Sequence, residues 1–321
     1  MPLQFDPEFA EAAAPILQEF GQVAKPAVHD ITARRIWAGA ISNKFPKSSL
    51  PEGMEHLVYH APTPAGDYQI PIHHYRQKRA PEENDDRKGP AVVHLHGGGY
   101  FSLSPEDLQQ LLVGYASGSG VQILSVDYRL APEHPYPIPV EDCYTALQWV
   151  YSCVEKLSID SHRIAVMGES AGGGLAAAVA VMARDRGLFP PLAKQILVYP
   201  MLDDRAFENH AGERAFWTTE DSITGWTAYL GEDVGTNRVS PYAAPARVGS
   251  VEGLPPVYID CGQLDIFLQQ DAEYASRFIE AGIPIEFHVY PGLPHGFEGL
   301  APMAGCTKRA MENRFRAIRE I

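Results

Sequence analysis

The sequence is poor in cysteine and in long apolar runs. Its 321 residues include four cysteines that stand apart without a CxxC pair, which favours free thiols in a reducing, cytoplasmic compartment over a disulfide framework. No segment approaches the roughly 20 apolar residues that span a bilayer, so we expect no membrane span. The N-terminus lacks a basic region followed by an uninterrupted apolar stretch, which predicts no secretory signal.

Positive charge is also scarce. Lys and Arg number 26 against 40 Asp and Glu, for a formal net charge of −14, so a polyanion would be repelled and nucleic acid is excluded as a partner. Hydrophobic residues make up 45% of the chain and charged residues 21%, the balance of a globular enzyme. A homodimer is compatible with this composition.

Short apolar runs alternate with helix-length segments along most of the chain. The runs lie at 91–95, 121–126, 163–167, 195–199, 257–261 and 285–290, and the spacers at 105–119, 140–157, 172–186 and 270–282. This order predicts an α/β fold with a mostly parallel central sheet covered by helices on both faces. Two alternating segments, 56–60 and 68–75, predict a leading antiparallel hairpin.

Two parts of the chain do not fit this alternation. Residues 1–50 precede every core strand, and residues 200–256 contain no clear core strand although they are too many for a plain loop. We therefore expect a helical cap, made of residues 1–50 and an insertion at about 203–245, on a catalytic domain at 51–321. Aromatic side chains of the insertion either line a pocket or form the core of the cap: Phe207, Phe216, Trp217, Trp226 and Tyr229. The charged segment 76–90 predicts a solvated loop.

A G-x-S-x-G sequence occupies residues 168–172, directly after one predicted strand and directly before a predicted helix. A serine hydroxyl is a poor nucleophile unless a base can reach it, and a strained strand-to-helix turn lifts it above the sheet. The alternative is a glycine-rich turn in which the serine only caps the helix. In this context Ser170 is the candidate nucleophile.

The sequence His96-Gly97-Gly98-Gly99 ends the predicted strand at 91–95. A run of glycines lets backbone N–H groups face a substrate oxygen. We expect an oxyanion hole formed by the amides of Gly97, Gly98 and Ala171, although which two glycines donate stays open. A phosphate-binding loop is disfavoured, because no lysine or threonine follows as in a P-loop and the G-x-G-x-x-G spacing is absent.

Histidine and aspartate candidates follow two later strands. His295 lies in a loop directly after the strand at 285–290 and is the candidate general base. In the chain order serine, acid, histidine, the acid lies between the other two. Asp265 fits, because it follows the strand at 257–261 and so lies at its carboxyl end. Asp260 inside that strand and Asp271 in the next predicted helix are poorer candidates.

Five motifs occur in order along the chain: HGGGY at 96–100, VDYRLAPEHPYP at 126–137, GESAGG at 168–173, GQLD at 262–265 and PHGF at 294–297. Together they resemble the hormone-sensitive lipase-like branch of the α/β-hydrolases, over roughly residues 55–300. The resemblance implies the α/β-hydrolase fold, a cap of N-terminal helices plus an insertion, and an intracellular esterase without a cofactor. Glu169 stands where the family usually has aspartate, and Gln269 replaces a second carboxylate of the acid motif.

These observations predict a serine-dependent carboxylic-ester hydrolase that acts on small, short-acyl or aryl esters through an acyl-enzyme intermediate. The alternatives are a lipase, amidase or lactonase with the same triad, or a ligand-binding receptor-like member of the fold. The plant gibberellin receptor, which resembles this family, has lost the catalytic histidine, whereas His295 is present here. A metal site on His94 and His96 lacks an evident third ligand, so we expect no metal and no cofactor. The expected partner is a small-molecule ester.

Overall fold

The computed structural model describes residues 3–21, 23, 25–42, 44, 49–78 and 88–321. Most of the predicted solvated loop at 76–90 lies outside these described residues. Within them, no helix combines the length and the apolar character needed to cross a membrane.

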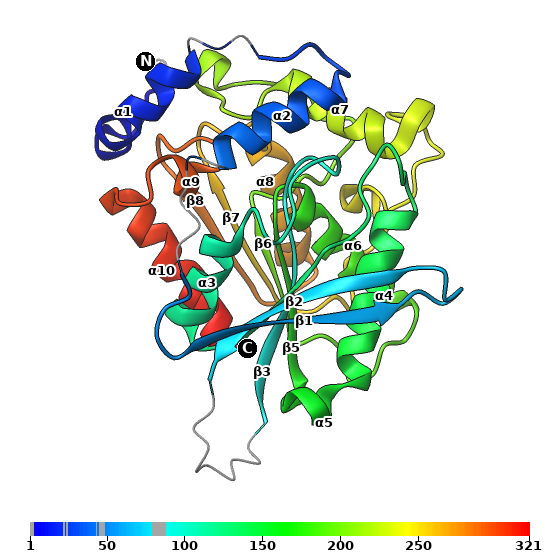
Figure 1. Cartoon of the computed structure of the whole chain (residues 1–321). Coiled ribbons are helices and arrows are strands. Elements are labelled where there is room, and N and C mark those ends of the chain that lie inside the picture. Colours follow the sequence, from blue (N-terminus) through cyan, green and yellow to red (C-terminus); the bar gives the residue numbers. More distant parts are fainter. Residues whose placement is uncertain (1–2, 22, 24, 43, 45–48, 79–87) are drawn as a thin grey trace.

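Eight strands form one central sheet in this part of the chain, in the order β1-β2-β4-β3-β5-β6-β7-β8 (Figure 1). β1 and β2 pair antiparallel with each other, β2 pairs antiparallel with β4, and the remaining strands pair in parallel. The strands are β1 (Met54–Pro62), β2 (Gln69–Gln77), β3 (Gly89–Leu95), β4 (Gln122–Val126), β5 (Ile159–Glu169), β6 (Lys194–Val198), β7 (Val257–Gly262) and β8 (Ile285–Tyr290). Both the parallel sheet and the leading hairpin are confirmed.

Helices cover both faces of the sheet, as predicted. Successive strand side chains point to opposite faces, so Val93 packs with residues of α4, α6 and α8, whereas Val92 packs with residues of α3 and α10. Burial on both faces explains why the strands are continuous apolar runs and not alternating ones. These helices are α3 (Gln109–Ser119), α4 (Ile138–Ser152), α5 (Val154–Leu157), α6 (Ala171–Asp185), α8 (Leu268–Glu280), α9 (Phe297–Leu300) and α10 (Gly305–Arg319).

No sequence pattern above predicted α10, and its inward face shows why. Alongside Ala310 and Ala317, the buried residues of this helix include Thr307 and Arg314. A polar side chain on the buried face weakens the apolar periodicity on which a helix prediction depends.

Three helices from distant parts of the chain lie together above one end of the sheet (Figure 1). They are α1 (Pro7–Gly21), α2 (Ile31–Ser42) and α7 (Thr219–Leu230), and short 3-10 turns flank α7 at Gly212–Arg214, Gly231–Asp233 and Pro245–Arg247. Buried Asp221 joins these segments, because its carboxylate pairs with Arg34 of α2 and, at 3.1 Å, with Lys25. Asp221 also takes part in the capping box of α7 with Thr218.

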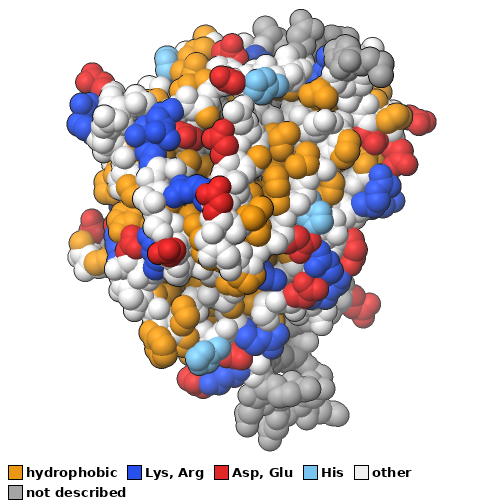
Figure 2. All heavy atoms as spheres, turned by 180° about the vertical axis from the view of Figure 1, so that it is seen from behind, with side chains coloured by type: hydrophobic (Ala, Val, Ile, Leu, Met, Phe, Trp, Pro, Cys, Tyr) orange, Lys and Arg blue, Asp and Glu red, His pale blue; other side chains and the backbone are white. Residues whose placement is uncertain are grey.

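The face opposite the view of Figure 1 carries charges of both signs. Among its described residues, Figure 2 shows acidic and basic side chains interspersed, with no large basic area. The exclusion of nucleic acid, the homodimer and the cytoplasmic location stay predictions.

Candidate active site

Ser170 occupies the sharp turn between β5 and α6. Its backbone adopts φ +56° and ψ −121°, a left-handed φ that residues other than glycine rarely adopt. The flanking glycines make the turn possible: a Cβ atom on Gly172 would lie 2.0 Å from the carbonyl oxygen of Leu95, and one on Gly168 would lie 2.3 Å from that of Gly172. The glycine spacing of the motif therefore has a steric cause.

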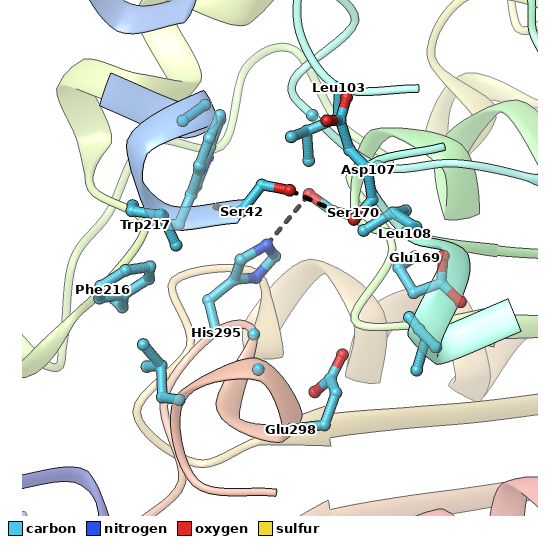
Figure 3. A pocket seen from close by; sticks show the side chains of 18 of the residues that line it. Ser42, Leu103, Asp107, Leu108, Glu169, Ser170, Phe216, Trp217, His295 and Glu298 are labelled. Atoms are coloured by element: carbon cyan, nitrogen blue, oxygen red, sulfur yellow. Dashed lines mark hydrogen bonds between the residues drawn. The ribbon is translucent and has the colours of Figure 1, made fainter. Parts of the chain in front are cut away.

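Three side chains from three strand ends form one hydrogen-bonded line (Figure 3 shows the Ser170–His295 bond). His295, after β8, has its Nε2 at 3.0 Å from the Ser170 hydroxyl and its Nδ1 at 2.7 Å from a carboxylate oxygen of Asp265, after β7. The second carboxylate oxygen of Asp265 accepts the backbone N–H of Phe267 at 3.0 Å. All three side chains are buried. The structure thus brings together the nucleophile, base and acid candidates.

Backbone amides face the same region from two sides. Gly97 and Gly98 follow β3, and an added Cβ on Gly97 would lie 3.1 Å from the carbonyl oxygen of Glu169, so this loop lies against the serine turn. The hydrogen bonds among described residues include none donated by the backbone N–H of Gly97 or Gly98. Ala171 is the first residue of α6, where an N–H has no partner within the helix. All three candidate donors are therefore available to a ligand.

A cavity of about 530 Å³ opens at Ser170 and His295. Phe216 and Trp217 of the insertion line it, whereas Trp226 and Tyr229 are fully buried in the core. Some aromatic residues of the insertion thus line the cavity and others belong to the core. The sequence alone did not show which residues do which. Further lining residues come from α2, α3 and the α9–α10 region: Trp37, Ile41, Leu108, Leu111, Leu300 and Met311.

Known proteins resemble this chain over most of its length. Residues 92–299 match the model of a family described as having the alpha/beta hydrolase fold. The esterase LipI of Mycobacterium tuberculosis is 33% identical over 240 residues, which cover 74% of each chain. An ethyl acetate hydrolase of Pseudomonas putida is 29% identical over 72% of each chain. A solved structure named bacterial heroin esterase superposes with a TM-score of 0.86 at 33% identity, covering 99% of this chain and 98% of the other.

The chain belongs to the α/β-hydrolase family. The predicted fold class and the resemblance to the branch that contains these esterases are both confirmed, as is the enzyme class, a carboxylesterase. The ordered motifs and the matched region cover nearly the same residues.

Aromatic rings enclose the imidazole of this α/β-hydrolase. The ring centroid of His295 lies 4.4 Å from that of Tyr199, 5.3 Å from that of Phe267 and 5.9 Å from that of Trp217. Sequence reasoning did not single out Tyr199, although it directly follows β6, at the same sheet edge as Asp265 and His295. Position after a strand was the signal that could have found it.

The two histidines of the metal alternative contact groups of the core, although His96 Nε2 has no hydrogen-bond partner among the described residues. His94 Nδ1 lies 2.9 Å from the Ser125 hydroxyl and its Nε2 lies 2.8 Å from the Glu169 carboxylate, both in the core. His96 lies 2.8 Å from the carbonyl of Gly97, and burial lowers the pKa of His96 to about 4. The prediction of His94 as a satisfied core histidine is confirmed. In the described residues one group of three side chains could hold a metal, and it contains neither histidine: Asp6, Glu8 and Cys306.

Glu169, which precedes the nucleophile, is ionised in a buried position. Burial by itself would raise the pKa of Glu169, but His94 and then Arg314 outweigh it, so the pKa lies below its ordinary value. Asp260, the weaker acid candidate, pairs with the fully buried Arg314 at 2.7 Å and 3.0 Å. That pairing, and its place inside β7, separate Asp260 from His295.

A third carboxylate, on the mostly buried side chain of Glu298, completes this charge network. Oε1 of Glu298, on α9, accepts a hydrogen bond from the Tyr199 hydroxyl and lies 3.4 Å from Arg314 Nη1. Sequence reasoning missed both Glu298 and Arg314. Glu298 directly follows the PHGF motif, whereas nothing in the sequence around Arg314 marks it as buried.

Proposed function

We propose that this carboxylesterase works through a serine acyl-enzyme with Ser170, His295 and Asp265 as its triad. The observation that carries the proposal is the hydrogen-bonded line from Asp265 through His295 to Ser170 at the wall of the cavity. Ser170 Oγ attacks the ester carbonyl carbon while His295 Nε2 takes the hydroxyl proton, and Asp265 stabilises the imidazolium that forms.

The intermediate then collapses in the usual order for this chemistry. The alcohol leaves with the proton from His295, and Ser170 is left acylated. Water attacks the acyl carbon while His295 takes its proton, and the acid leaves as the serine hydroxyl is restored. In both steps the amides of Gly97, Gly98 and Ala171 stabilise the negative charge on the carbonyl oxygen.

We further propose that residues 1–50 and the insertion at about 203–245 act as one cap over this site. The buried pairing of Asp221 with Arg34 supports a single unit. Arg35 of α2 attaches it to the rest of the molecule, since its guanidinium donates to the carbonyl oxygens of Phe101 and Ala131 at 2.7 Å and 3.0 Å.

The substrate class we propose is small esters with short acyl or aryl groups. The cavity is lined mainly by aromatic and aliphatic side chains, which suits a compact ester, and the ethyl acetate hydrolase is a relative whose name gives a short ester. A lipase presents a large contiguous apolar face when its cap opens, whereas the insertion exposes charged side chains such as Arg205 and Glu208. The presence of both Ser170 and His295 argues against a receptor-like protein.

An irreversible active-site label tests this proposal directly. A fluorophosphonate should add one adduct per chain and stop hydrolysis of p-nitrophenyl butyrate, with the adduct mapped by mass spectrometry to the peptide that contains Ser170. The Ser170→Ala variant should take up no label. Esterase activity that survives complete labelling, or an adduct on another residue, would overturn the assignment.

A further inference from the structure

Two carboxylates of the cavity lining, Glu169 and Glu298, each have a buried oxygen without a hydrogen-bond partner among the described residues, and Glu298 belongs to the loop and helix that follow His295. Only 9% of the Glu298 side chain is exposed, and Tyr199 and Arg314 both contact its Oε1. Its Oε2 is buried and has no hydrogen-bond partner among the described residues. Leaving such an atom unpaired costs about 1–3 kcal/mol, or more when the group is charged. Oε2 has almost no accessible surface, but Glu298 lines the cavity, so the negative charge of its carboxylate acts on a ligand held there.

The charges around the cavity favour a cationic donor. Its described lining residues include three carboxylates, Asp107, Glu169 and Glu298, and neither lysine nor arginine. Arg314 lies behind Glu298 and is shared with Asp260, so this group of three keeps one net negative charge. Low exposure strengthens the attraction, because water screens it poorly.

Aromatic lining adds to the same preference. Trp37, Tyr199, Phe216 and Trp217 line the cavity, and the faces of aromatic rings attract cations. Figure 3 shows Glu298 on the other side of His295 from Trp217. A substrate held at Ser170 can therefore extend one of its parts toward the carboxylate.

We propose that Glu298 binds a protonated amine of the substrate, so that the preferred esters carry an ammonium group in the acyl or the alcohol part. This inference rests on the proposed function. The ammonium group lies beside Glu298 at the cavity wall, where the charge of the carboxylate attracts it, and Tyr199 and Arg314 hold that carboxylate through Oε1. Glu298 is thus a specificity-determining residue, and the triad performs the chemistry.

Pairs of esters with equal shape and different charge provide the test. In the alcohol part, 2-(dimethylammonio)ethyl acetate is compared with 3-methylbutyl acetate. In the acyl part, methyl 4-(dimethylammonio)butyrate is compared with methyl 5-methylhexanoate. We expect kcat/KM, followed by pH-stat at pH 7, to be about tenfold higher for the cationic member of at least one pair. A ratio of one or below in both pairs overturns the proposal, and this result needs no variant.

The Glu298→Gln variant assigns the preference to one residue. It keeps the shape and an oxygen that can accept the Tyr199 hydroxyl, but it removes the charge. We expect the cationic-to-neutral ratio of kcat/KM to fall about tenfold; because both esters are measured on the same variant, a change in activity that they share cancels in this ratio. Asp107→Asn is the matched control, since Asp107 lines the same cavity but accepts the Ser104 hydroxyl at 2.8 Å. An equal fall in this control, or an unchanged ratio in Glu298→Gln, overturns the assignment.

Failure of the proposed function would look different. If Ser170→Ala still hydrolysed the neutral esters, the acyl-enzyme proposal would fail whatever the charge preference. If wild-type protein hydrolysed the neutral esters through Ser170 but showed no preference for the cationic ones, only the role of Glu298 would fail.

Discussion

Replacing Asp265 with asparagine tests the acid assignment most sharply, because it changes charge and hydrogen bonding with little change of shape. One carboxylate oxygen accepts from His295 Nδ1 at 2.7 Å, and the other accepts the Phe267 N–H at 3.0 Å. Asparagine has one oxygen and one NH2 group, so it cannot accept both bonds.

Each orientation of the amide has its own cost. With its nitrogen toward His295, the amide donates to Nδ1, so the imidazole carries its proton on Nε2 and cannot accept that of Ser170. With its oxygen toward His295, the NH2 group faces the Phe267 N–H, and the unsatisfied donors cost about 1–3 kcal/mol. Both orientations lose the charge that stabilises the imidazolium. We expect kcat to fall roughly 10³- to 10⁴-fold, or about 4–5.5 kcal/mol of transition-state stabilisation.

The assay is kcat for p-nitrophenyl butyrate, with thermal unfolding measured on the same preparations. Asp271→Asn is the matched control: burial, and then Asp265, hold the pKa of Asp271 well above its usual range, so a neutral amide replaces a neutral acid and kcat should stay within threefold. Asp260→Asn breaks the buried pair with Arg314, so we expect its free energy of unfolding to fall by about 3–5 kcal/mol. The kcat of the molecules that remain folded should fall much less than in Asp265→Asn. More than a tenth of kcat remaining in Asp265→Asn, or equal losses of kcat in all three variants, would refute the reasoning.

Four further outcomes are expected. Ser170→Ala should lower kcat by roughly 10³-fold or more with the protein still folded by circular dichroism, and near-normal activity would contradict the triad. Gly172→Ala should abolish the folded state or lower its unfolding midpoint strongly, because the added Cβ would lie 2.0 Å from the Leu95 carbonyl oxygen; a normal midpoint would contradict the steric argument. Dialysis against EDTA should leave kcat unchanged, since His94 is engaged with Glu169, and a loss restored by zinc would revive the metal alternative. For p-nitrophenyl esters from acetate to palmitate, kcat/KM should be highest at short chains, whereas a long-chain maximum that rises at an emulsified interface would indicate a lipase.

The strands were predictable from the sequence because each is a short apolar run. The helices between them were predictable because each spacer has the length of a helix. The sequence predicted strands at 91–95 and 285–290, and the structure has β3 and β8 at Gly89–Leu95 and Ile285–Tyr290. The order of strands in the sheet was not predictable in the same way. β4 lies between β2 and β3, an arrangement fixed by contacts distant in sequence, and no local pattern encodes it.

The candidate triad was predictable for a different reason. Ser170, Asp265 and His295 each follow a strand, and the carboxyl ends of parallel strands meet at one edge of a sheet. Tyr199 follows the same rule and was missed only because tyrosine has no established place in the triad. Glu298 and Arg314 lie on helices, where position along the chain does not tell which side chain reaches the site.

The buried charges of this enzyme connect α10 to His295, the candidate general base. Arg314 is fully buried on α10 and holds both Asp260 of β7 and Glu298 of α9, while Glu298 holds Tyr199, whose ring packs on His295. Removing one member of such a network leaves the others buried without compensation, which costs more than the network contributes when intact. We therefore infer that Arg314 is buried because it positions Glu298 and Tyr199 at the cavity wall, and not because its burial makes the fold more stable.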